Sequence, residues 1–431
     1  MANQKIFCNV PWTNLHIYWD GSYGACCSER HAPHNEPEKY NLKTENIVNW
    51  YNSKPMTDVR AQIKSDEPLS MCSSCYREEA NGLESRRIKE NFKTVIFTEQ
   101  AFGRSYEQST FIDEFERPDN KTTRLPIDWH VDFGNECNFA CKMCYPKASS
   151  KISAHYVKWG LQSTSSNRNW TLDETSWENF KKSVLLVENL NRMHFMGGEP
   201  LLNKKFRSLL EFLLENKPNI SLSFVNNGSL ITDDLIDTLK KFKSCDVEVS
   251  LESISNNNEY IRQGADTELI ISNIQKLKNA QTDAFTVVLR SVPQLLNVNN
   301  YDKYIQYAWD NQISIQCIPL NKPSYLQISV LPKELREQLK PRYEKLKSTF
   351  ADKQEFKTII TGRNISGLAQ QLVRECDTII AMLSEPEPSN VTELRQELSE
   401  WLMRWDREYN LDAREYYPEY REFLDSIGYN V

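Results

Sequence analysis

The sequence lacks any feature that would insert the chain into a membrane or export it. Its 431 residues contain no apolar run close to the ~20 residues that a membrane-spanning helix requires. Residues 1–10 have neither the basic nor the apolar region of a signal peptide. Positive charge is not in excess, because the formal net charge is −7, and this argues against binding to nucleic acid. We therefore expect a cytoplasmic protein of two or three domains, with no membrane contact.

Cysteine, by contrast, is abundant, with eleven in the chain. In a protein without an export signal these thiols stay reduced, so their number indicates metal binding rather than a disulfide framework. Seven of them form two groups. Cys245, Cys317 and Cys376 stand alone in apolar or helical contexts and are predicted to be small buried side chains. Cys27 adjoins Cys26, and either of the two could be a ligand.

Three cysteines occur at CxxxCxxC spacing: Cys137, Cys141 and Cys144, followed by the aromatic Tyr145. Three thiolates from one short loop can hold a cubic iron–sulfur cluster by three corners, which leaves the fourth iron open to another ligand. The alternative is a zinc site, which needs a closed tetrahedron of four ligands. Such a site could recruit the pair Cys72 and Cys75.

A second motif is the run Gly197, Gly198, Glu199 and Pro200, which follows a short strand-like segment. Two glycines let the backbone approach a ligand closely, and the carboxylate of Glu199 can pair with an ammonium group. By itself, such a run is also an ordinary strand-to-helix turn.

Together the two motifs resemble the signatures of the radical S-adenosylmethionine (SAM) enzymes. The resemblance implies that Cys137, Cys141 and Cys144 bind a [4Fe–4S] cluster whose fourth iron chelates SAM. It also implies that Tyr145 lies along the adenine, and that the GGEP run contacts the methionyl amine. In that family an electron from the cluster cleaves SAM, and the 5′-deoxyadenosyl radical abstracts a hydrogen atom from a substrate.

Strand-like and helical segments alternate from about residue 127, as in a parallel α/β sheet. The predicted strands are His130–Phe133, Met193–Met196, Ser221–Val225, Asp246–Leu251, Phe285–Leu289 and Ile313–Ile318. Six strands fit the partial (β/α)6 TIM-like barrel that the resemblance implies.

Polar residues follow several of these strands, at the sheet edge where parallel barrels bind ligands. They are Asn226, Asn227, Ser250, Glu252 and Arg290. By resemblance, Ser250 and Glu252 would contact the ribose of SAM and Arg290 its carboxylate. Each could also be an ordinary polar strand end, although for Glu252 and Arg290 the burial of a charge favours a functional role.

The intervening helices are predicted from periodicity and caps. Thr232 is an expected N-cap, a second helix is expected from Asp266 to Ala280, and residues 162–168 read as an inserted loop. After residue 322 the alternation gives way to helical segments such as Leu331–Lys347 and Val391–Arg407. The predicted domains are residues 1–125, 126–322 and 323–431.

The first domain contains the second cysteine group: Cys8, Cys26, Cys72 and Cys75. A hairpin with Asp20-Gly21 as its turn separates the first two. This spacing resembles the opening of the SPASM and twitch domains, which carry auxiliary [4Fe–4S] clusters, although those domains normally follow the barrel. The resemblance implies one auxiliary cluster on these four thiols, and a structural zinc is the alternative.

The helical stretch from Tyr76 to Lys93 carries Arg77, Arg86, Arg87 and Lys89. We expect these charges to form a solvated face, with recognition of an acidic substrate as the lesser alternative.

The sequence thus predicts a radical SAM enzyme that modifies a small molecule or a peptide. Peptide maturases commonly begin with a winged-helix recognition module, which this sequence lacks, and this favours a small molecule or a peptide delivered by a partner. A reducing partner such as flavodoxin or ferredoxin is expected. The alternative is a non-enzymatic iron–sulfur or zinc scaffold.

Overall fold

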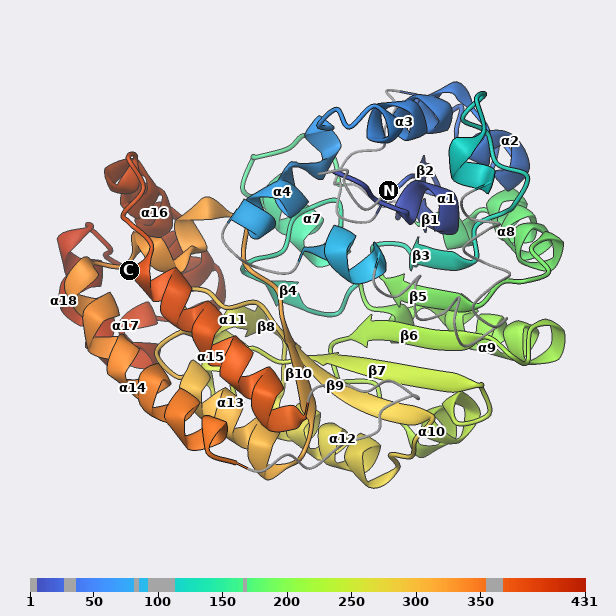
Figure 1. Cartoon of the computed structure of the whole chain (residues 1–431). Coiled ribbons are helices and arrows are strands. Elements are labelled where there is room, and N and C mark those ends of the chain that lie inside the picture. The colour runs from blue at the N-terminus through green and yellow to red at the C-terminus, as the bar shows by residue number, and fades with distance from the viewer. Residues whose placement is uncertain (1–5, 27–35, 81–84, 92–112, 166–168, 354–366) are drawn as a thin grey trace. The chain divides into compact units, whose positions relative to one another are not determined.

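The structure, a computed structural model, describes residues 6–26, 36–80, 85–91, 113–165, 169–353 and 367–431 (Figure 1). The chain divides into two compact units. The first contains Met1–Glu136 and Ser166–Phe224, and the second contains Cys137–Ser165 and Val225–Val431.

The first unit is built on a sheet with the strand order β6-β5-β3-β1-β2. All neighbouring strands are parallel except β1 and β2, which form an antiparallel hairpin. The strands are β1 (Asn14–Ile17), β2 (Tyr23–Gly24), β3 (Asp128–Asp132), β5 (Arg192–Met196) and β6 (Ser221–Asn226). The helices include α1 (Val10–Thr13), α2 (Ile47–Tyr51), α3 (Lys54–Lys64), α4 (Ser73–Ala80), α8 (Glu174–Leu186) and α9 (Lys204–Asn216). The first three predicted barrel strands are confirmed.

Alternate residues of these strands face two environments. Trp129 of β3 packs against Phe180 of α8, and Phe195 of β5 packs against Phe206 of α9. Burying such aromatic side chains contributes roughly 1.5–3 kcal/mol each. The opposite face of the same strands carries buried polar side chains, among them His130.

The predicted N-terminal hairpin is present and also extends the parallel sheet. Gly21 has φ +83°, and its N–H donates to the Tyr18 carbonyl at 2.8 Å, which closes the turn. Strand β1 then pairs in parallel with β3, in the register His16 to His130. This pairing was not predicted, because strand periodicity does not identify the partner of a strand.

In the second unit, β7 (Ser244–Ser250), β9 (Phe285–Ser291) and β10 (Ser314–Cys317) pair in parallel and confirm the remaining predicted strands. A short antiparallel pair, β4 (Ala140–Cys141) with β8 (Arg262–Gln263), was not predicted. Two residues per strand are too few to show a period. The helices are α7 (Ser150–Lys158), α10 (Asp233–Leu239), α11 (Asn257–Ile261), α12 (Thr267–Asn279), α13 (Tyr301–Asp310), α14 (Lys333–Ala351), α15 (Leu368–Ser384), α16 (Val391–Tyr409), α17 (Ala413–Tyr416) and α18 (Arg421–Ser426).

The predicted helix starts are confirmed by their capping bonds. Thr232 accepts from the N–H of Leu235 at 3.3 Å, and Asp266 accepts from the N–H of Leu269 at 2.9 Å. The predicted inserted loop follows α7, and residues 166–168 of it lie outside the described part of the chain.

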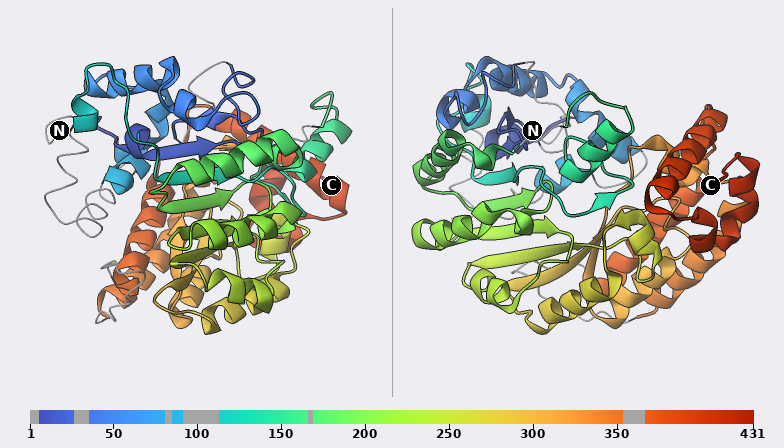
Figure 2. Two further views of the ribbon diagram at one scale, coloured as in Figure 1. Left: turned by 90° about the vertical axis from the view of Figure 1, so that its right-hand side faces the viewer. Right: turned by 180° about the vertical axis from the view of Figure 1, so that it is seen from behind.

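The C-terminal region is helical, as predicted, and the chain has the expected α/β class with mostly parallel strands. Helices α14 and α15 lie side by side (Figures 1 and 2). The buried Arg336 of α14 donates to the carbonyl of Leu383, where a cation complements the helix C-terminus of α15. Of the helices that the structure describes, none has both the length and the apolarity that crossing a membrane requires.

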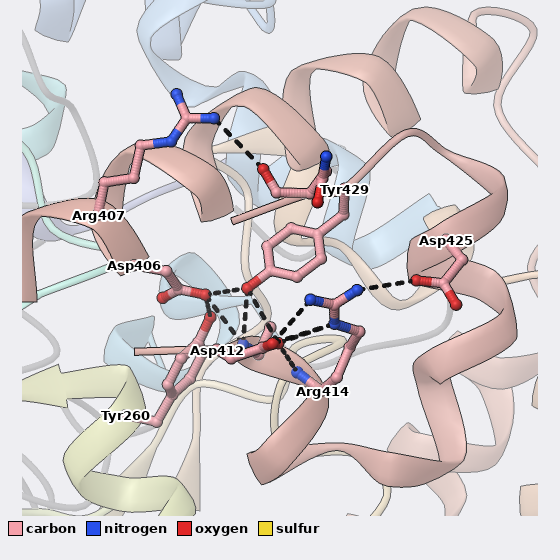
Figure 3. Close-up of polar contacts among 9 residues, drawn as sticks. Tyr260, Asp406, Arg407, Asp412, Arg414, Asp425 and Tyr429 are labelled. Atoms are coloured by element: carbon pink, nitrogen blue, oxygen red, sulfur yellow. Dashed lines mark hydrogen bonds and ion pairs between the residues drawn. The ribbon is translucent and has the colours of Figure 1, made fainter. Parts of the chain in front are cut away.

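A buried carboxylate joins the last elements of the chain (Figure 3). Asp406 of α16 is fully buried, and its Oδ2 accepts from the hydroxyls of Tyr260 and Tyr429 at 3.0 and 2.5 Å. The N–H of Ala413 donates to the same oxygen at 3.0 Å. Burial raises the pKa of Asp406, whereas Lys142 and the two tyrosine hydroxyls lower it. This carboxylate therefore holds α16, α17 and the C-terminal segment to α11.

We expect Asp406→Ala to destabilise the protein by roughly 3 kcal/mol, because several buried donors lose their acceptor. Urea denaturation measures the change. Asp425→Asn is the matched control, since Asp425 forms an exposed ion pair with Arg414 and should cost less than about 1 kcal/mol. Equal effects of the two substitutions would contradict this role of Asp406.

Candidate functional site

The cysteines of the CxxxCxxC run lie on one loop of the second unit. Cys141 belongs to β4, and the N–H of Cys144 donates to the Cys141 carbonyl at 2.9 Å. The N–H of Cys137 donates to Ser150 Oγ at 3.2 Å, and the N–H of Phe139 points at Cys137 Sγ at 3.5 Å. These bonds fix the backbone between the three thiols.

A buried ion pair stands beside the middle thiol. The Arg262 Nη1 atom lies 3.6 Å from Cys141 Sγ, and Nη2 lies 2.6 Å from Glu252 Oε1. Burial raises the pKa of the Cys141 thiol above its usual value, and the charge of Arg262 opposes part of this shift. Burial would lower the pKa of Arg262, but Cys141 and Glu252 raise it. A permanent cation beside the sulfur favours the thiolate, the form that binds metal.

Glu252 is held by further donors. Its Oε2 accepts from Ser291 Oγ at 2.9 Å, from the N–H of Val292 at 2.9 Å and from Asn297 Nδ2 at 3.1 Å. The side chain is fully buried. These contacts connect the end of β7 with the loop after β9, and the predicted bond from Glu252 to a ribose stays a prediction.

The other predicted residues on these two strands lie close to each other. Ser250 is opposite Arg290 in the β7–β9 register, and Arg290 forms an ion pair with Glu248. Their predicted contacts with SAM also stay predictions.

The predicted asparagines connect the end of β6 with the cysteine loop. Asn227 Nδ2 donates to Asn138 Oδ1 at 2.7 Å, and Asn138 Nδ2 donates to Ser229 Oγ at 3.0 Å. Asn226 Nδ2 donates to the Glu248 carbonyl at 3.1 Å. The cysteine loop is thus hydrogen-bonded to the turn that follows β6.

In the first unit, the GGEP run forms a tight turn against the end of β3. Gly197 and Gly198 have φ +88° and +50°, values that favour glycine. A Cβ atom on Gly198 would stand 2.1 Å from the Glu136 carbonyl oxygen, and one on Gly197 would stand 2.8 Å from that of Gly134. Both glycines are therefore required by the turn itself.

The rest of the run is also fixed. The N–H of Glu199 donates to the Glu136 carbonyl at 2.6 Å, and the buried Glu199 side chain accepts from the N–H of Leu201 at 3.0 Å. Pro200 begins the short 3-10 helix Pro200–Leu202. The predicted pairing of Glu199 with an amine stays a prediction.

Lys142, inside the cysteine run, is a residue that the sequence analysis missed. Its Nζ donates to the Tyr260 carbonyl at 2.8 Å and lies 4.0 Å from Asp406 Oδ1. Nζ also lies 3.8 Å from the centroid of the Tyr260 ring. Burial lowers the pKa of Lys142 to about 7, although Asp406 opposes the shift. Lys142 therefore connects the cysteine loop to α16.

Tyr145, which follows the last cysteine of the loop, is half-buried. Its predicted position along the adenine of SAM stays a prediction.

The four predicted auxiliary cysteines line one pocket of the first unit. Cys8 precedes α1, Cys26 follows β2, and Cys72 and Cys75 lie at helical spacing on one face. Burial raises the pKa of Cys8 well above its usual value, and the charges of Cys26, Cys72 and Cys75 raise it further. Across the described ranges, no three or more His, Cys, Asp or Glu side chains are placed to hold a single metal ion.

The prediction that the charges of the Tyr76–Lys93 stretch form a solvated face is wrong for two arginines. Arg86 and Arg87 line the pocket with the cysteines. Arg87 is buried, forms an ion pair with Glu79 and donates to the Phe7 carbonyl at 2.9 Å. Of the four charges, Arg77 and Lys89 are exposed. Two cations in a thiol-lined pocket complement the negative charge of thiolates.

Three of the remaining cysteines were predicted to be small buried side chains. Cys245 and Cys376 are buried, and Cys317 is half-buried and bonded to the Tyr301 hydroxyl. Cys27, the alternative to Cys26, lies outside the described residues.

Two family models match the chain. Residues 131–294 match the "Radical SAM superfamily", and residues 8–76 match the "SPASM" iron–sulfur cluster-binding domain. The first match contains the CxxxCxxC and GGEP runs, and the second contains the four auxiliary cysteines.

Several curated proteins are similar to part of the chain. The radical SAM cyclopropyl synthase TigE of Paramaledivibacter caminithermalis is 30% identical over 36% of this chain and 34% of that protein. A GTP 3′,8-cyclase of a Sulfurovum species is 26% identical over 44% of this chain and 53% of that protein. The nucleotide dehydratase RSAD2 of Danio rerio is 24% identical over 40% of this chain and 46% of that protein. The chain thus spans only about a third to a half of each of these relatives.

The chain is also similar to solved structures, with lower sequence identity than to these relatives. The enzyme anSMEcpe with bound AdoMet has 19% identity and a TM-score of 0.40, over 53% of this chain and 62% of that one. SuiB of Streptococcus suis, solved with S-adenosylmethionine, has 12% identity and a TM-score of 0.40, over 68% and 63%. SuiB was also solved bound to its precursor peptide SuiA.

We expect Gly198→Ala to weaken SAM binding at least tenfold, because a side chain there both strains the backbone and meets the Glu136 carbonyl. Equilibrium dialysis with labelled SAM on the reconstituted protein measures the affinity. Gly160→Ala is the control, since Gly160 also has positive φ (+70°) but no atom within 4 Å of the added Cβ. Wild-type SAM affinity in Gly198→Ala would contradict the role given to this turn.

Proposed function

Because the chain carries a radical SAM domain preceded by a SPASM iron–sulfur cluster-binding domain, we propose that it is an enzyme that reductively cleaves SAM and oxidises, rearranges or cross-links a substrate. The observation that carries the proposal is the Cys137–Cys144 loop, whose three thiols are presented from a backbone fixed on both sides.

The donor set of this loop fits a [4Fe–4S] cluster with one open iron. Cys137, Cys141 and Cys144 would hold it, and Arg262 supplies an N–H and a positive charge to one of the sulfurs. When bound, this cluster supplies the electron that cleaves SAM. The chain contributes orientation and exclusion of water rather than acid–base chemistry at the reacting carbon.

The polar residues to which the resemblance points would position SAM. The GGEP turn offers backbone groups and Glu199 for the methionyl end, and Tyr145 would lie along the adenine. Ser250 and Glu252 are the proposed residues on the side of the ribose, and Arg290 on the side of the carboxylate. Asn226 and Asn227 are proposed cofactor-binding residues without an assigned group. Because Glu252 and Arg290 already have protein partners, we propose that they act mainly by holding the strand ends in place.

The second thiol pocket fits an auxiliary cluster. Cys8, Cys26, Cys72 and Cys75 would supply four ligands, which leaves no open iron for substrate and makes electron transfer the proposed role. Arg86 and Arg87 would offset the negative charge of the thiolates.

The substrate is a small molecule or a peptide, and a flavodoxin or ferredoxin is the proposed reductant. TigE is named for cyclopropyl formation, while other relatives are named for acting on GTP or another nucleotide. We also propose a cytoplasmic location, because a reducing compartment keeps the ligand thiols free.

The reduced, anaerobically reconstituted protein should convert SAM to 5′-deoxyadenosine and methionine, quantified by liquid chromatography. Replacing Cys137, Cys141 and Cys144 with Ala should halve the iron, from about eight to about four atoms per chain, and abolish the products. Cys245→Ala is the control, because this lone buried thiol lies outside both cysteine groups. No products from the wild type, together with bound zinc, would instead support a scaffold.

Replacing Cys72 and Cys75 with Ala should also remove about four iron atoms but leave uncoupled SAM cleavage largely intact, because the CxxxCxxC loop is unchanged. Iron analysis and the same product assay measure both effects. Unchanged iron content would refute the auxiliary assignment.

A further inference from the structure

Three histidines form a buried row across the sheet of the first unit. His16, His130 and His194 occupy matching register positions on β1, β3 and β5, and Ser223 of β6 continues the row. Each histidine is at most 5% exposed. The row lies on the sheet face opposite to Trp129, which packs against α8. No part of the proposed function uses these side chains.

His16 differs from the other two because it contacts the auxiliary site. Its Nδ1 lies 3.2 Å from the Cys26 carbonyl oxygen, and a carbonyl can only accept, so Nδ1 carries the proton. Its Nε2 lies 3.3 Å from Asp132 Oδ2. The Tyr18 ring packs at 4.1 Å between centroids. Carboxylate, imidazole and the backbone of a ligand residue thus form one chain of contacts.

The far end of the row is anchored differently. His194 Nδ1 lies 2.7 Å from Ser223 Oγ, and Arg192 donates to the same hydroxyl oxygen at 2.9 Å. The one hydroxyl proton of Ser223 is then available to His194 Nδ1. His194 therefore shares the burial and strand setting of His16, but it has a strand hydroxyl as its partner instead of a cysteine segment.

Asp132, which lies beside His16, also lies close to the GGEP turn. Asp132 ends β3, and its Cβ is among the atoms nearest to an added Cβ on Gly197, at 3.1 Å. The segment that packs against the GGEP turn therefore also carries the carboxylate that lies beside His16.

We propose that His16 is a positioning residue for the auxiliary cluster: through its Nδ1 contact it fixes the backbone of Cys26 and so the geometry of that ligand. This inference rests on the proposed auxiliary cluster. Outer-shell hydrogen bonds of this kind orient metal ligands, and their loss typically lowers metal affinity about 10–100-fold.

The test uses the full chain with Cys137, Cys141 and Cys144 replaced by Ala, so that only the auxiliary cluster contributes to the signal. His16→Ala in this background should lose iron to a chelator about 10–100-fold faster and should change the reduced cluster's EPR spectrum and midpoint potential. His16→Asn keeps a donor nitrogen near the position of Nδ1 and should restore much of the wild-type behaviour. Asp132→Asn should have a smaller effect than His16→Ala.

His194→Asn is the matched control, because it alters the same buried row without touching Cys26. Wild-type iron loss, spectrum and potential in His16→Ala would overturn the inference. Equal changes in His16→Ala and His194→Asn would also overturn it, since they would reflect disruption of the core. A background protein that holds no iron before any histidine is changed would instead overturn the proposed auxiliary cluster itself.

Discussion

The contact on which the second unit depends is the buried chain from Cys141 through Arg262 to Glu252. A thiolate in an apolar interior is costly, and so is a buried carboxylate, and the Arg262 guanidinium between them offsets part of that cost. Glu252 in turn accepts hydrogen bonds from the end of β9 and the segment after it, which connects the cysteine loop to that strand. The result is a cysteine loop whose middle thiol, that of Cys141, is positioned from two strands at once.

A second buried charge gives the C-terminal helices a role in the same loop. Lys142 lies in the chain between Cys141 and Cys144 and contacts Tyr260 and Asp406. Asp406 also accepts a hydrogen bond from Tyr429 near the end of the chain. Buried pairs of this kind add little net stability over apolar packing, but they penalise any arrangement in which one partner is missing. The C-terminal helical region therefore favours one conformation of the cysteine loop over arrangements in which Lys142 or Asp406 lacks its partner.

In the first unit the corresponding constraint is steric. Gly197 and Gly198 lie so close to the backbone that follows β3 that no side chain fits, and Asp132 at the end of that strand reaches His16. The β1–β2 hairpin, which Cys26 directly follows, is part of the same sheet through the β1–β3 pairing. The segment of the proposed auxiliary site and the GGEP turn thus both pack against strand β3.

The sequence by itself determined the features that depend on spacing and period. The CxxxCxxC loop, the GGEP turn, the six strands and the capped helices all follow from residues near one another in the chain, as does the helical character of the C-terminal region. The partners of these features were decided only by tertiary structure. Asp406 meets Lys142, Arg262 meets Cys141, and β1 pairs with β3, although nothing in their local sequences specifies those contacts. The reason is physical: local patterns fix which groups are buried, but the compensating charge or strand for a buried group can come from any part of the chain that the fold brings within reach.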